Sequence, residues 1–371
     1  MSRVLLLIPG MRASGGTERM VANLAALLGE RHEVAVASFD PPGSAPVFAL
    51  SCPYHPLGSG GAPRPFAYLD QARRLRALEK RLGTQVTISN LWRADLVSAL
   101  AGRHARRVAL AHINVVGNPT NAAMLRLRPF VAAIYRRLDR LVAVSAALET
   151  ELATLYRLRP GPHAAIPNFV APAVRQPGPR DPNLFVWCGR MVPEKNVPAL
   201  PAILAQLHRT HPNARFELIG DGPDHAAVAA QATAEAVPVT FHGQLADPSP
   251  VIARAAALLL PSRAEGLPMV VLEALALGTP VVAADAPSGG VGEALGRTTS
   301  HDPRRTTPEW TEAGVLLPVP ETAAHATLWA EALADRDRLN ARSTGARARA
   351  GSFAPAAVAD RWDTLITGLT P

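Results

Sequence analysis

The chain has 371 residues, of which 48% are hydrophobic and 18% charged, so it is a globular protein and not a disordered one. Its length favours two domains, each with its own core. The formal net charge of +8 is uneven: residues 1–170 carry 21 Arg or Lys against 10 Asp or Glu, whereas residues 171–371 carry 17 against 20. A basic N-terminal half suits an anionic partner, such as a phosphorylated acceptor, an anionic membrane face or nucleic acid.

The first half of the chain alternates short apolar strands with helical patterns. We expect strands over residues 3–8, 33–38, 85–89, 108–112 and 141–145, and helices over 16–28, 94–101, 121–137 and 146–156. The Pro- and Gly-rich stretch 41–65 predicts a loop. Such alternation indicates a parallel sheet with helices on both faces.

A Pro-rich stretch then interrupts the alternation, and a second unit follows it. We expect strands over residues 184–188, 215–220, 239–242, 257–261, 279–284 and 314–317, and helices over 197–211, 225–236, 251–256, 268–278, 322–350 and 355–369. The domain boundaries that follow are 1–167, a linker over 168–182, 183–352, and a C-terminal helix over 353–371 that could cross back to the first domain.

Cysteine usage and hydropathy predict where the protein resides. Cys52 and Cys188 are far apart in sequence and lack metal-ligand spacing, which favours a reducing compartment. No apolar run reaches the ~18 residues of a membrane span, and the segment 3–8 is too short for a signal-peptide core. We therefore expect a cytoplasmic protein.

Two glutamates eight positions apart, Glu265 and Glu273, are the most informative feature. Pro268 suits the first position of a helix and Gly278 its end, so Glu265 lies in a loop after a strand and Glu273 lies in the helix. Ligands bind at that edge of open α/β sheets, and carboxylates accept hydrogen bonds from sugar or ribose hydroxyls. For either residue alone, a surface Glu or a helix Glu paired with an arginine is the simpler interpretation.

The second unit opens with Gly189, Arg190 and Lys195 at the end of a strand. Lys195 is one of only two lysines among 38 basic residues, so a lysine here is unusual for this chain. An Arg and a Lys at this edge can neutralise a departing diphosphate. Surface pairing with Glu194 is the alternative interpretation.

Two further candidates lie in the first half. Gly15 and Gly16 would let backbone N–H groups approach a ligand at a helix N-terminus, and a plain Gly-Gly turn is an equal alternative. His112 closes a strand, where it could contact a sugar, although on sequence alone a satisfied core histidine is favoured. The chain has no dinucleotide fingerprint, no Walker A sequence and no metal-ligand cluster.

With these residues in place, the chain resembles the retaining glycosyltransferases of the GT-B fold, in the large family 4 type that includes bacterial mannosyl-, glucosyl- and N-acetylhexosaminyltransferases. The resemblance covers nearly the full length. It rests on Gly15–Glu18, Val144–Ser145, Ile166–Asn168, Gly189–Arg190 with Lys195, and Glu265 through Glu273. It implies two Rossmann-like domains whose parallel sheets face each other across a cleft, the first binding the acceptor and the second the nucleotide sugar.

The resemblance also implies roles for individual residues. Glu265 would contact the donor sugar, Glu273 the nucleotide ribose, and His112 the transferred sugar. Arg190 and Lys195 would hold the diphosphate. The donor site would further include Gly15, Gly16, Gly189, Gly266, Leu267, Pro268 and Met269.

The expected reaction moves a hexose or N-acetylhexosamine, with retention, from a nucleotide sugar to a glycan or lipid-diphosphate acceptor. It would serve cell-surface polysaccharide, lipopolysaccharide or glycoprotein glycan assembly, with UDP favoured as the nucleotide, and would need no metal and no cofactor. Residues 285–293 resemble a segment of UDP-sugar enzymes, but Gly290 replaces a proline and an extra residue precedes Glu293, which weakens that inference.

The basic half could also touch an anionic membrane at its inner face. Residues 124–140 mix Arg with apolar side chains as an interfacial helix would, and an ordinary solvated helix face is an equal alternative.

A GT-B nucleotide-sugar epimerase or a phosphorylase is the first rival function, although no lysine follows Lys195 to carry the pyridoxal phosphate of a phosphorylase. A nucleic-acid-binding protein ranks far lower, because aromatic content is 5% and no binding signature occurs.

Overall fold

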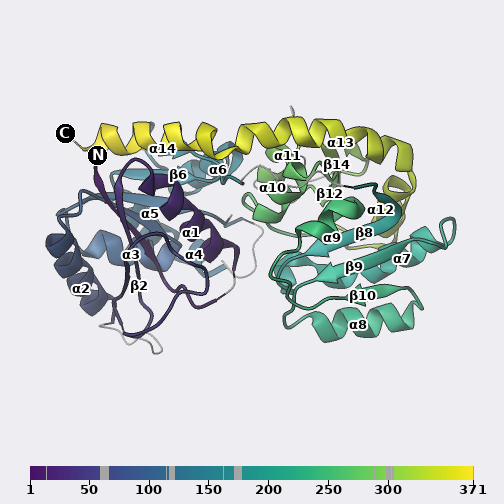
Figure 1. Ribbon diagram of the computed structural model, residues 1–371, viewed down its shortest axis with the longest axis horizontal. Helices are drawn as coiled ribbons and strands as arrows, with labels where there is room; N and C mark the ends of the chain where they lie inside the picture. The colour runs from purple at the N-terminus through teal and green to yellow at the C-terminus, as the bar shows by residue number, and fades with distance from the viewer. Residues whose placement is uncertain are drawn as a thin grey trace. The chain divides into compact units, whose positions relative to one another are not determined.

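The computed structural model describes residues 1–13, 15–58, 67–113, 115–116, 122–161, 163–170, 178–287, 289–297, 302 and 305–370. The chain forms two compact units (Figure 1). The first contains Met1–Ile113, Ala123–Asn168 and Pro355–Pro371, and the second contains Phe169–Ala354 together with the described residues of 114–122. Of the expected linker 168–182, residues 171–177 lie outside the described residues, and the next strand already begins at Asp181.

The first unit is built on a parallel sheet that has seven strands over the described residues, in the order β3-β2-β1-β4-β5-β6-β7. The strands are β1 (Arg3–Ile8), β2 (Glu33–Ser38), β3 (Tyr54–Pro56), β4 (Val86–Asn90), β5 (Arg106–Ala111), β6 (Arg140–Ala143) and β7 (His163–Ala165). The chain winds outward from β1 in one direction and then in the other, so the strand order reverses between β1 and β4. In open α/β sheets ligands bind at such a switch point.

Helices flank this sheet: α1 (Gly16–Gly29), α2 (Ala67–Leu82), α3 (Trp92–Leu100), α4 (Ala122–Arg126), α5 (Arg128–Tyr135), α6 (Ala146–Tyr156) and α14 (Pro355–Leu369). The expected single helix over 121–137 is wrong, because Pro129 occupies the first turn of α5 and α4 ends before it. Residue 121 of that prediction lies outside the described residues.

Helix α2 was not predicted from the sequence. Its buried face includes Glu79, whose carboxylate pairs with Arg107 of β5, with Nη2 at 2.9 Å from Oε2, and also accepts from Thr87 Oγ1 at 2.7 Å. Both charged side chains are almost completely buried. The buried face of α2 therefore includes a charged residue at a position where an apolar residue would have indicated a helix.

The C-terminal helix α14 packs on α1 of the first unit. Asp360 pairs with Arg31 at 2.7 Å, and Asp363 approaches His32 Nε2 at 3.2 Å. Burial lowers the pKa of His32 below its usual value. Val358, Trp362 and Ile366 form the buried face of α14, so this helix completes the first unit's core.

The second unit repeats the scheme with strand order β10-β9-β8-β11-β12-β14-β13 over its described residues. The strands are β8 (Asp181–Cys188), β9 (Arg215–Ile219), β10 (Val239–Phe241), β11 (Ala255–Leu260), β12 (Val281–Ala284), β13 (Glu309–Trp310) and β14 (Gly314–Leu317). All pairings are parallel except that of β13 with β14 at one edge. Here the order reverses between β8 and β11.

The helical elements of this unit are η2 (Pro193–Lys195), η3 (Val197–Ala199), α7 (Leu200–His208), α8 (His225–Ala234), α9 (Ser249–Arg254), α10 (Met269–Ala276), α11 (Gly290–Ala294), α12 (Ala323–Ala334), α13 (Arg336–Ala350) and η4 (Gly351–Phe353). The expected helix over 322–350 is two helices, because Asp335 breaks the first and caps the second by accepting from Arg338 N.

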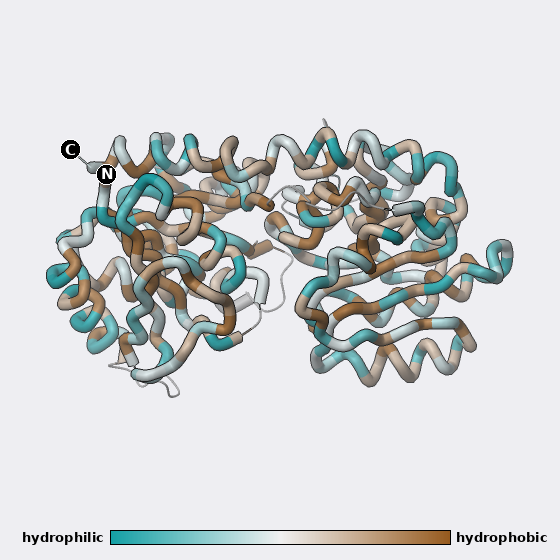
Figure 2. Tube along the Cα trace, in the orientation of Figure 1, coloured by the Kyte–Doolittle hydropathy of each residue, from teal (hydrophilic) through white to brown (hydrophobic). Residues whose placement is uncertain are grey.

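Apolar residues concentrate along the strands of both sheets (Figure 2). In the second unit Trp187 and Trp329 lie in one core cluster, and in the first unit Leu5 and Leu7 of β1 pack with residues of α2 and α3. The prediction of two parallel-sheet α/β domains is confirmed. Among the described helices, none combines the length and the apolar character needed to cross a bilayer.

Candidate functional site

The switch point of the second unit lies between the loops that follow β8 and β11. The β8 loop is held against the β9 loop by backbone hydrogen bonds: Gly189 N donates to Ile219 O at 2.9 Å, and Met191 N donates to Asp221 O at 2.9 Å. Gly220 has φ +122°, and a Cβ there would lie 1.8 Å from Gly189 O. Only glycine allows this approach. The loop that contains Gly189 and Arg190 is therefore held in place by the loop after β9.

An ion pair joins the β8 loop to the β11 loop. Lys195 Nζ lies 2.7 Å from Glu265 Oε1 and 2.8 Å from Oε2, and Ser262 Oγ donates to Oε1 at 2.7 Å. Glu265 is 6% exposed and the Lys195 side chain 24% exposed. Two residues that the sequence singled out separately thus meet at the carboxyl ends of neighbouring strands. Lys195 thus pairs with Glu265 and not with Glu194, the partner in the alternative interpretation of the sequence.

Backbone contacts reinforce the same junction. Arg263 N donates to Glu194 O at 2.8 Å, and its guanidinium reaches Pro193 O at 3.1 Å. The two loops therefore form one layer at the switch point, with Lys195 and Glu265 at its centre. Arg190 is exposed at the start of this layer.

Helix α10 begins directly after this layer. Pro268 is its N-cap and not its first helical residue, with φ −71° and ψ 134°, and Gly278 ends it with φ +70°. Leu267 and Met269, on either side of Pro268, are both buried. The N-terminus of α10, which is the positive end of its dipole, thus follows Glu265 by four residues. Glu273 is half-buried, one turn further along α10.

The segment 285–293 after β12 carries an ion cluster. Asp285 is buried and pairs with Arg297, and with Arg305 at 2.8 Å. Arg305 also contacts Glu309 at 2.6 Å. This carboxylate therefore has a structural role in holding the edge of the sheet. Residue 288 lies outside the described residues.

The glycine loop of the first unit precedes α1. Gly15 is the N-cap of α1, and a Cβ there would lie 2.2 Å from Glu18 Oε2, whereas nothing lies within 4 Å of a Cβ on Gly16. The glycine at position 15 thus makes room for the Glu18 carboxylate, as the Gly-Gly turn alternative supposes. Residue 14 lies outside the described residues.

His112 follows β5 and contacts a residue that the sequence did not single out. Its Nε2 lies 2.9 Å from Oδ1 of Asn90, the last residue of β4. Burial lowers the pKa of His112 to about 4, so the ring is neutral near pH 7. Asn90 is separated from His112 by 22 positions, and only its place at a strand end could have drawn attention to it.

Within the described ranges, no three His, Cys, Asp or Glu side chains gather as a metal would need.

Comparison with known proteins identifies the class. A family model described as glycosyl transferases group 1 matches residues 182–327, and one described as glycosyltransferase family 4 matches residues 14–174. Together they cover the greater part of the chain. Each parallel-sheet unit thus matches a glycosyltransferase model, and the chain has the GT-B fold.

Relatives and solved structures agree with this assignment. Glycogen synthase of Mycobacterium tuberculosis is 30% identical over 227 residues, which are 57% of this chain and 50% of that protein, so the chain spans about half the length of such curated relatives. Sucrose-phosphate synthase of Thermosynechococcus elongatus superposes with a TM-score of 0.79 at 22% identity, covering 100% of this chain and 99% of that one. HepE of Anabaena, in complex with UDP and glucose, gives 0.76 at 20% identity over 99% and 100%.

The close approach at Gly220 generates a testable prediction. Gly243→Ala, at φ +63° with open space around the new Cβ, should cost about 1–2 kcal/mol of unfolding free energy for its backbone conformation. Gly220→Ala should cost about 1–3 kcal/mol more, because its Cβ also meets the β8 loop. Urea unfolding of both variants measures the difference. Equal losses would mean that the β8 loop is not held by this contact.

Proposed function

We propose that the chain is a retaining glycosyltransferase that moves a hexose or N-acetylhexosamine from a nucleotide sugar to a glycan or lipid-linked acceptor in polysaccharide assembly. The observation that carries this proposal is the Lys195–Glu265 pair at the switch point between β8 and β11. UDP is the favoured nucleotide. The HepE structure, which has the same fold, was solved with UDP and glucose.

In this proposal Glu265 binds the donor sugar. Its carboxylate is held by Lys195 and Ser262, so its position is set before a ligand arrives. An ionised carboxylate accepts hydrogen bonds only, which suits the hydroxyls of a sugar. Glu273, further along α10, would accept from the ribose hydroxyls of the nucleotide.

The diphosphate would lie against Arg190, Lys195 and the first turn of α10. When the bond between the anomeric carbon and the phosphate oxygen breaks, the leaving diphosphate gains negative charge. Fixed cations and backbone N–H groups stabilise that charge in the transition state more than in the ground state. Since these protein groups supply the positive potential, the proposal needs no metal and no cofactor besides the nucleotide sugar.

Retention follows if the acceptor attacks from the face that the diphosphate leaves. The acceptor oxygen forms the new bond to the anomeric carbon, and its proton passes to the departing phosphate oxygen. Gly15, Gly16 and His112 of the first unit are proposed to contact the donor or the transferred sugar, and the basic first unit to receive the acceptor.

Removing one cation or the ribose ligand should abolish most transfer. Lys195→Ala should lower kcat/KM at least about 100-fold, the loss typical of one missing transition-state donor. Glu273→Ala should lower it at least about tenfold, because the ribose hydroxyls lose a charged acceptor. Lys80→Ala and Glu331→Ala, at exposed helix positions, are matched controls that should retain activity. Nucleotide release from UDP-hexoses, UDP-N-acetylhexosamines and GDP-mannose, with a lipid-linked acceptor extract, is the assay.

The same assay separates the rival reactions. If the protein converts a UDP-sugar to its epimer when no acceptor is present, its reaction is epimerisation and not sugar transfer. Full activity of Lys195→Ala or Glu273→Ala, with circular dichroism confirming the fold, would refute these site residues.

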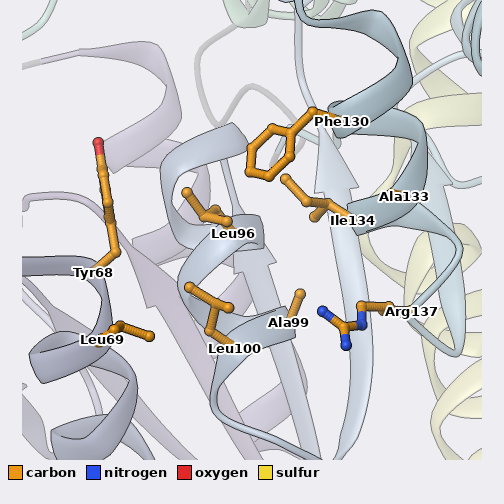
Figure 3. Close-up of a pocket in the computed structure, with 9 residues that line it drawn as sticks. All are labelled: Tyr68, Leu69, Leu96, Ala99, Leu100, Phe130, Ala133, Ile134 and Arg137. Carbon is orange, nitrogen blue, oxygen red and sulfur yellow. The ribbon is translucent and has the colours of Figure 1, made fainter. Parts of the chain in front are cut away.

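We also infer that an anionic membrane surface is a partner of the first unit. An open apolar pocket of about 290 Å³ lies between α2, α3 and α5 (Figure 3). Its wall includes Leu69 and Phe130, which are 46% and 52% exposed, and Arg137. Arg73 and Arg76 share the exposed face of α2 with Leu69 by helical spacing. Apolar side chains among arginines suit acyl chains beneath anionic headgroups.

Vesicle binding tests this partner. Phe130→Glu should weaken binding to vesicles containing phosphatidylglycerol at least about tenfold, because an apolar anchor is lost and a like charge is added. Arg137→Gln should weaken it about fivefold. Leu245→Glu and Arg209→Gln of the second unit are controls. Unchanged binding of Phe130→Glu, or a dimer in sedimentation that this variant dissociates, would reject the membrane in favour of another occupant.

A further inference from the structure

The orientation of the Asn90 side chain is fixed by its surroundings. Asn90 is fully buried at the carboxyl end of β4, beside the switch point of the first unit. Its Nδ2 lies 3.2 Å from Leu7 O of β1 and 3.4 Å from Ile88 O. Carbonyl oxygens only accept hydrogen bonds, so the amide nitrogen has to face them. The amide oxygen Oδ1 therefore faces His112.

This orientation dictates the protonation of the His112 ring. Oδ1 of Asn90 can only accept, so Nε2 of His112, 2.9 Å away, carries the proton. Burial keeps the ring neutral near pH 7, since the pKa of His112 is lowered to about 4. A neutral imidazole has one N–H group, so Nδ1 is left as a hydrogen-bond acceptor.

The backbone register places this pair at the ligand edge of the sheet. Asn90 is paired with Leu110 of β5, two residues before His112, and its neighbour Ser89 is paired with Leu7 of β1. The amide thus spans from the first strand of the switch point to the residue that follows β5. The residue as a whole is partly buried and directly follows the strand end, at the edge where ligands bind.

We propose that Asn90 is a positioning residue that locks His112 in the Nε2–H tautomer, so that Nδ1 accepts a hydrogen bond from a hydroxyl of the transferred sugar. The part that concerns the sugar rests on the proposed function, whereas the tautomer does not. His112 then recognises a sugar hydroxyl by accepting its hydrogen bond at Nδ1. It does not donate a proton to the leaving group.

The experiment uses the full chain labelled with ¹⁵N-histidine. Two-bond ¹H–¹⁵N correlation spectra at pH 7 report the tautomer, and loss of one signal set in His112→Gln assigns the ring among the 11 histidines. We expect a single Nε2–H pattern in the wild type and a mixture of the two neutral tautomers in Asn90→Ala, because the acceptor that selects one of them is removed. Thr87→Val is the control, because Thr87 is also a buried β4 residue with one side-chain hydrogen bond.

Kinetics test the sugar contact. Asn90→Ala should lower kcat/KM about tenfold, whereas Thr87→Val, compared at matched folded fraction, should leave it unchanged. An Nδ1–H pattern, a charged ring or a tautomer mixture in the wild type would overturn the proposal, as would equal kinetic losses in both variants. Failure of the proposed function looks different: the wild type would release no nucleotide from any donor while its Nε2–H pattern persisted.

Discussion

The ion pair between Lys195 and Glu265 is the contact on which the second unit's ligand edge depends. It joins loops that follow β8 and β11, the two neighbouring strands between which the strand order reverses. Such a partly buried pair contributes little net stability, because desolvation of the two charges offsets their attraction. Its value lies in position: it holds a cation and a carboxylate side by side where a diphosphate and a sugar would lie.

The first unit obeys the same topological rule with different chemistry. Its switch point lies between β1 and β4, and there a neutral amide takes the place of the ion pair. Asn90 connects the β1 backbone to His112, and the low pKa of that ring, about 4, makes it a neutral partner for hydroxyl groups. Each unit thus carries polar groups at the carboxyl ends of strands at or next to its own reversal.

Local patterns in the sequence predicted much of this architecture. Short apolar runs and helical periodicity placed most strands and helices, and Pro268 and Gly278 marked the ends of the helix after β11. Helix α2 was missed because its inward face includes the charged Glu79, whose partner Arg107 is distant in sequence. The break between α4 and α5 was missed although Pro129 stands at the start of α5 and is the physical cause.

The contacts that organise the site could not be predicted from the sequence, because the residues that make them are far apart in it. Lys195 and Glu265 are 70 positions apart, and Asn90 and His112 are 22 apart, so neither pair leaves a periodic signature. Each becomes visible only once the sheet sets neighbouring strand ends side by side. Gly220 is similar, because its need for a missing Cβ arises from Gly189 in the loop after β8.

The most direct test of the central claim is a crystal structure of the full chain with a bound UDP-sugar. We expect the diphosphate against Arg190 and Lys195 and the sugar hydroxyls within hydrogen-bond distance of Glu265. A nucleotide bound away from the β8–β11 junction, with Lys195 and Glu265 out of contact with it, would contradict the account.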